Sequence, residues 1–104
     1  MENRKTDKDF LELVGINIKN RRKQLCLTCK QLSEKTGILP SNISVIEHGR
    51  SNPQLLTFLI LAKGLNTTVK KFFEIPFNYD DYKVTEKVYE PYSNRRKRKK
   101  KDDE

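Results

Sequence analysis

The chain has 104 residues, enough for one domain with a modest core but too few for a deep catalytic cleft between domains. Hydrophobic and charged residues each make up 35% of it, which suggests one folded part with polar tails. Residues 10–75 hold ten Lys and Arg against four Glu, so the expected folded part is itself basic. That balance favours attraction to a polyanion such as DNA, and solubility alone is the simpler alternative.

The inventory of reactive residues disfavours an enzyme. One histidine, four glycines and no phosphate-binding Gly-rich loop leave little to build a catalytic site, and we expect no metal and no cofactor. Cys26 and Cys29 form a CxxC pair without a second pair of ligands, so we expect ordinary residues, with redox sensing as the alternative. No apolar stretch is long enough to span a bilayer, and the N-terminus has no signal core, which predicts a cytoplasmic protein.

The first helix is expected after a flexible N-terminus of residues 1–8. Asp9 can cap it, and apolar residues recur at helical spacing as far as Leu25. We expect the folded domain to cover residues 9–75.

The second helix is predicted over residues 29–36. Thr28 and Gln31 have the spacing of a capping box, and Leu27 and Leu32 that of a hydrophobic staple. Gly37 suits a left-handed helix end.

A third helix is expected only three residues later. Pro40 fits its first position, Ile43 and Ile46 form its inward face, and Gly49 ends it. Two short helices joined by a short turn that contains Gly predict a helix-turn-helix.

A fourth helix is expected to open at Asn52-Pro53 and to run to about Lys63 or Leu65. Its predicted inward face comprises Leu55, Phe58, Ala62 and Leu65. Leu56 and Ile60 form a second apolar stripe, which suits either a dimer contact or a seat for the Tyr-rich segment that follows.

The fifth helix is short in this interpretation. Thr67 or Thr68 caps it, and it ends near Ile75 because Pro76 follows. Residues 76–94 form an aromatic extension, in which the alternation over residues 82–89 predicts a short strand. Residues 95–104 contain seven consecutive basic residues and are expected to be a disordered tail that binds DNA phosphates, RNA or an anionic membrane, or only adds solubility.

Residues 15–73 resemble the Cro/repressor family of helix-turn-helix domains, which includes phage repressors and restriction-modification controller proteins. The most specific part of the match is an ordered run of residues: Thr28, Leu32, Gly37, Ile43, Ser44, Ile46, Glu47 and Gly49. The resemblance implies an all-α, five-helix bundle whose third helix enters the major groove. It also implies that Arg22 and Glu47 pair beneath the motif.

The family's DNA-contacting positions fall on two sets of residues in this chain. Those that contact bases in the family correspond to Pro40, Ser41, Asn42 and Val45. Those that contact phosphates correspond to Arg22, Thr28, His48, Arg50 and Asn52, and Lys30 joins them as an exposed cation. The chain departs from the family at Cys29, which replaces a phosphate-contacting Gln, and at Leu39, which replaces a Ser or Thr cap. Arg21 stands where the family is normally apolar.

Three functions are compatible with this pattern. The leading one is a sequence-specific transcriptional regulator that binds double-stranded DNA as a homodimer on two half-sites. The second is an antitoxin with autoregulatory DNA binding, whose Leu56/Ile60 stripe and residues 76–94 contact a protein partner. The third is a protein-interaction module without DNA binding.

Overall fold

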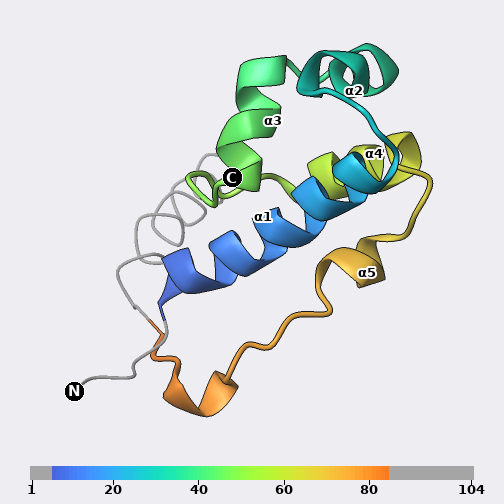
Figure 1. Ribbon diagram of the computed structural model, residues 1–104. Helices are drawn as coiled ribbons and strands as arrows, with labels where there is room; N and C mark the ends of the chain where they lie inside the picture. The colour runs from blue at the N-terminus through green and yellow to red at the C-terminus, as the bar shows by residue number, and fades with distance from the viewer. Residues whose placement is uncertain (1–5, 85–104) are drawn as a thin grey trace, which may run out of the picture.

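The computed structural model describes residues 6–84, and this part of the chain is built from helices (Figure 1). The elements in chain order are α1 (Asp7–Gln24), α2 (Cys29–Thr36), α3 (Pro40–Glu47), α4 (Leu55–Gly64), α5 (Val69–Phe72) and a 3₁₀ turn (Tyr79–Asp81). The helical content and the order of the five α-helices confirm the expected all-α class.

The first helix begins earlier than its sequence pattern indicated. Thr6, rather than Asp9, is the N-cap. The Thr6 hydroxyl accepts from the Asp9 N–H at 3.2 Å, and the Asp9 carboxylate accepts from the Thr6 N–H at 2.9 Å. Asp9 is therefore the third residue of a capping box, in which its charge also favours the positive end of the helix.

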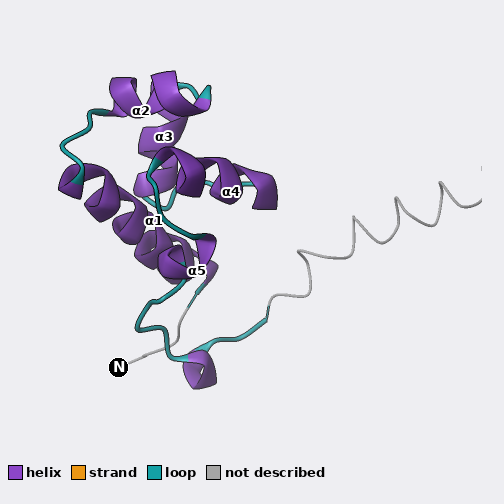
Figure 2. Ribbon diagram, turned by 90° about the vertical axis from the view of Figure 1, so that its right-hand side faces the viewer, coloured by secondary structure: helices purple, strands orange, loops and turns teal. Residues whose placement is uncertain are grey.

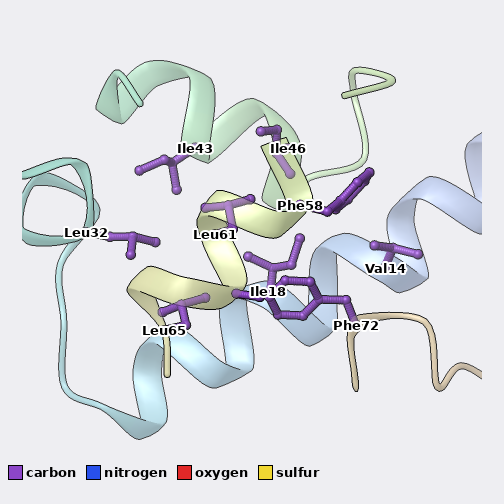
Figure 3. Packing of buried hydrophobic residues seen from close by; sticks show 10 residues of the cluster. Val14, Ile18, Leu32, Ile43, Ile46, Phe58, Leu61, Leu65 and Phe72 are labelled. Atoms are coloured by element: carbon purple, nitrogen blue, oxygen red, sulfur yellow. The ribbon is translucent and has the colours of Figure 1, made fainter. Parts of the chain in front are cut away.

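The core lies between the five helices, and α1 packs against α3 and α5. Ile18 of α1 is fully buried and points toward Leu61 and Phe72, which come from α4 and α5 (Figure 3). The cluster of buried residues comprises Val14, Ile18, Leu32, Ile43, Ile46, Phe58, Leu61, Ala62, Leu65 and Phe72. Every one of the five helices contributes to this core, so each is held by burial of apolar surface.

The prediction of the inward face of α4 is wrong for one residue. Phe58, Ala62 and Leu65 are buried, but Leu55 is 75% exposed. Leu55 is the first residue of α4, which begins there and not at Asn52-Pro53, and it lies at the edge of the side that faces the core.

Two polar residues of α1 bind the ends of the later helices. The Arg21 guanidinium donates to the carbonyl oxygens of Leu65 and Asn66, both at 2.9 Å. The Asn17 amide donates to the carbonyls of Lys71 and Phe72 at the end of α5 and to that of Glu74 just after it, the shortest contact being 3.0 Å to Phe72. Carbonyls at helix ends have no partner within the helix, so α1 satisfies those of α4 and α5.

The segment after α5 packs at the end of the molecule opposite α2 and α3 (Figures 1 and 2). Phe77 is buried, with its ring edge-on to that of Phe10 at 5.3 Å between centroids, and the Tyr82 hydroxyl donates to the Asp7 carboxylate. Within residues 82–84, Tyr82 forms an isolated β-bridge and no longer strand is present, while the rest of the predicted strand and the basic tail of residues 95–104 lie outside the described residues.

Candidate nucleic-acid interface

The start of α2 has both halves of a capping box. The Thr28 hydroxyl accepts from the Gln31 N–H at 3.0 Å, and the Gln31 side-chain oxygen accepts from the Thr28 N–H at 2.9 Å. Leu32 is fully buried one turn later, and Leu27 packs against the same core. Local hydrogen bonds and burial thus fix where this helix begins.

The turn between α2 and α3 depends on Gly37 and Thr36. Gly37 has φ +83°, a left-handed conformation that residues with a side chain seldom adopt, and its N–H donates to the Ser33 carbonyl at 2.7 Å. The Thr36 hydroxyl accepts from the Ile38 N–H at 3.2 Å. These bonds turn the chain sharply, so that α3 begins at Pro40, directly after Leu39.

Helix α3 buries one side and exposes the other. Ile43, Ile46 and Glu47 are buried, whereas Ser41 and Val45 lie on the opposite side. No side chain caps the start of α3, because Leu39 stands at the N-cap position. Pro40 follows at the first helical position, where its missing N–H needs no partner.

A buried ion pair joins α3 to α1. Arg22 donates through Nε to one Glu47 carboxylate oxygen at 2.8 Å and through a terminal nitrogen to the other at 2.9 Å. Its second terminal nitrogen donates to the Leu27 carbonyl at 2.8 Å. The hydrogen bonds that Arg22 donates to the Glu47 carboxylate raise the pKa of Arg22 above its ordinary value. This bidentate pair fixes the position of α3 relative to α1 and to the loop before α2.

The same two helices also approach each other closely at Gly15. A methyl group at Gly15 would lie 2.5 Å from the carbonyl oxygens of both Ile46 and Glu47. Only glycine fits there, because the clash would be with backbone. The Gly15 contact and the Arg22–Glu47 pair together hold the C-terminal end of α3.

All four residues predicted to contact bases lie on α3 with exposed side chains: Pro40, Ser41, Asn42 and Val45. Val45, for which partial burial in the core was the alternative, is 37% exposed. The C-terminal segment described to residue 84 packs at the far end of α1, so it leaves this side of α3 uncovered (Figure 2).

The residues predicted to contact phosphates divide into two groups. Five are exposed at the start of α2 or after the end of α3: Thr28, Lys30, His48, Arg50 and Asn52. Arg22 is different, because it is 9% exposed and its guanidinium bonds Glu47 and the Leu27 carbonyl. The predicted pairing of Arg22 with Glu47 is confirmed, and the phosphate role of Arg22 stays a prediction.

Two surface features were not recognised in the sequence. Leu39 is 62% exposed immediately before α3. On α4, Leu55 and Leu59 extend the Leu56/Ile60 stripe, and we call the four residues the α4 outer face. The signal for this face was present, since the helix is apolar on every side from Leu55 to Ala62 except at Thr57.

The part of the chain from residue 6 to 84 has no group of three or more His, Cys, Asp or Glu placed to hold a metal ion. Both Cys26 and Cys29 are free thiols. Among the same residues, none of the helices has the length and hydropathy required to cross a bilayer.

The family model for the helix-turn-helix domain matches residues 15–76. The chain belongs to this family. It is 36% identical over 63 residues to the control protein C.SmaI of Serratia marcescens, an alignment that covers 61% of this chain and 75% of that protein. It is 32% identical over 60 residues to an uncharacterized helix-turn-helix transcriptional regulator of Sinorhizobium fredii, covering 58% and 78% of the two chains.

A solved structure shows the same arrangement of helices. The restriction-modification controller protein C.AhdI from Aeromonas hydrophila superposes with a TM-score of 0.59 at 25% identity, covering 61% of this chain and 96% of that one. The relatives are transcriptional regulators and controller proteins, a family without enzymatic activity, and this chain is not an enzyme.

Proposed function

We propose that this chain is a sequence-specific regulator of transcription that inserts α3 into the major groove of double-stranded DNA and binds as a dimer. The observation that supports it most strongly is the α2–turn–α3 unit. It presents Ser41, Asn42 and Val45 to solvent while the buried Arg22–Glu47 pair and Gly15 hold its inner side. A helix held in this way fits the major groove with its outer residues against base edges.

The distribution of charge around α3 suits separate sets of residues for phosphate binding and for base contact. Helix α3 contains no Lys or Arg, and its one charged residue, Glu47, is buried against Arg22. Exposed cations flank it instead, at Lys30 on α2 and at Arg50 after α3. In this proposal Lys30 and Arg50 bind phosphates and fix the orientation, whereas α3 supplies sequence preference.

The test is selection of bound sequences from random double-stranded DNA, followed by titration of the selected site. Asn42→Ala is expected to weaken the selected site by about 1–3 kcal/mol, roughly 5- to 150-fold, and to leave random DNA nearly unchanged. Asn20→Ala removes the same amide from an exposed position on α1 and is the matched control. Equal loss on selected and random DNA with Asn42→Ala would refute base contact by this residue.

Dimerisation is proposed to use the α4 outer face. Its four residues are between 43% and 75% exposed, even though residues 76–84 are already packed elsewhere, against the start of α1. The described part of the C-terminal extension therefore does not cover this face. A second copy offers the same apolar surface in a self-complementary, two-fold arrangement.

Sedimentation of the full chain at micromolar concentration tests this assignment. The wild type is expected to dimerise and Leu56→Glu to be monomeric with an unchanged helical spectrum. Lys70→Glu, at an exposed position on α5, is the control for added negative charge. A wild type that stays monomeric at all concentrations would refute the dimer, and a small protein that co-purifies through Leu56 would favour the antitoxin alternative.

A further inference from the structure

The composition of the surface around α3 is unusual for a surface that contacts DNA. From Leu39 to Val45 the exposed side chains are Leu39, Pro40, Ser41, Asn42 and Val45, three of them apolar and none of them charged. The side chain of Leu39 does not serve the fold, because it is 62% exposed and makes no cap hydrogen bond. A Ser or Thr at that position would stabilise the start of the helix.

Base pairs differ in what they offer to such a surface. Guanine presents two acceptors in the major groove and is most often recognised by Arg or Lys. Thymine presents a methyl group, which apolar side chains contact, and adenine presents an acceptor and a donor that match the amide of Asn or Gln. The exposed stretch from Leu39 to Val45 has the groups suited to these two bases: the amide of Asn42 suits adenine, and the apolar side chains of Leu39 and Val45 suit thymine.

We infer that the chain recognises A·T base pairs, with Asn42 bonding an adenine and with Leu39 and Val45 each contacting a thymine methyl group. This inference rests on the proposed function and specifies its substrate. Leu39 and Val45 are six residues apart, which is on the order of 9 Å along a helix. The two methyl groups therefore belong to base pairs two or three steps apart, with the adenine between them.

The experiment uses the full chain and the DNA site obtained by selection. Thymines in the selected site are replaced one at a time by deoxyuridine, which removes only the methyl group. We expect two positions, two or three base pairs apart, where uracil weakens binding by about fourfold, the factor expected for one buried methyl group. Thymines outside these positions serve as controls and are expected to tolerate uracil.

The variant Leu39→Ser assigns one of the two positions. It removes the apolar contact and supplies a helix cap, so the folded protein is expected to be at least as stable as the wild type. Its affinity for the thymine site should fall about fourfold, to the value for the uracil site, and discrimination at the other position should persist. Val84→Ser, which removes an exposed apolar residue of the C-terminal segment, should change neither position.

The outcomes separate the inference from the proposed function. A selected site with G·C pairs at the α3 positions, or one indifferent to uracil throughout, would overturn the inference while sequence-specific binding stands. If Leu39→Ser still discriminates thymine from uracil at both positions, Leu39 does not contact a thymine methyl group. A chain that enriches no sequence at all would refute the proposed function and the inference together.

Discussion

The Arg22–Glu47 pair gives the most demanding test of how α3 is held. Glu47→Gln keeps the size of the side chain and removes its charge, which leaves the Arg22 guanidinium buried without a counterion. Arg22 is 9% exposed and Glu47 4% exposed, so water cannot replace the lost partner. Removing one partner of a buried ion pair costs about 3–5 kcal/mol, and we expect the lower end because Gln still accepts one hydrogen bond.

A loss of about 3 kcal/mol is large against the roughly 5–15 kcal/mol that stabilises a small domain. With a urea dependence of about 1–3 kcal/mol per molar, the unfolding midpoint should fall by about 1–3 M. The measurement is urea denaturation followed by circular dichroism. Arg22→Met/Glu47→Met, which removes both charges, should recover much of the loss, since a buried pair replaced by apolar residues is often neutral in stability.

The pH dependence of the same variants provides a second check. The pKa of Arg22 is raised in the folded state, so its contribution is complete below the ordinary arginine pKa and is lost only as the pH rises through the folded value. The difference in urea midpoint between the wild type and Arg22→Met/Glu47→Met should therefore stay constant from about pH 6 to 9. A Glu47→Gln penalty below about 1 kcal/mol would show that the pair behaves as a surface salt bridge, and would refute the reasoning.

Three further predictions concern other parts of the chain. Gly15→Ala should lower stability by about 1–3 kcal/mol in thermal unfolding, because the added methyl meets backbone at 2.5 Å; an unchanged melting temperature would contradict that close approach. Arg21→Ala should cost about 1–2 kcal/mol in urea denaturation by leaving the Leu65 and Asn66 carbonyls without their donors, with exposed Lys23→Ala as the control and equal effects as the refuting result. Deletion of residues 95–104 should flatten the salt dependence of DNA binding and keep the sequence preference, whereas an unchanged slope would exclude the tail from binding.

The motif was predictable because its signals are local. The Thr28–Gln31 capping box, Gly37 and Pro40 specify helix starts and ends within four residues of themselves, and the structure has α2 over the predicted residues. The first helix shows the limit of such signals. Both Thr6 and Asp9 favour a helix start, and reciprocal hydrogen bonds between them, rather than the first apolar residue, decide it.

The features that could not be predicted depend on contacts between distant parts of the chain. The spacing of Leu55, Phe58 and Ala62 predicts one inward face, but α4 begins at Leu55, where the rest of the domain does not cover that face, and this side chain is 75% exposed. Arg21 looked like an anomaly in the sequence, because its partners lie 44 and 45 residues away and are backbone carbonyls, which have no sequence signature. The exposure of the Leu39 side chain likewise depends on the direction of the turn between α2 and α3, which the neighbouring residues in the sequence do not reveal.

The adjacent positions of Arg21 and Arg22 have a consequence for the dimer proposed above. Arg22 fixes α3, the helix proposed to enter the groove, and Arg21 fixes the end of α4, the helix proposed to meet the second subunit. In the proposed dimer, one turn of α1 would thus set the separation between the two copies of α3. In this proposal α1 links α3 and α4 rigidly. If the two half-sites are moved apart or together by one base pair, the DNA would therefore have to bend or twist to fit the dimer.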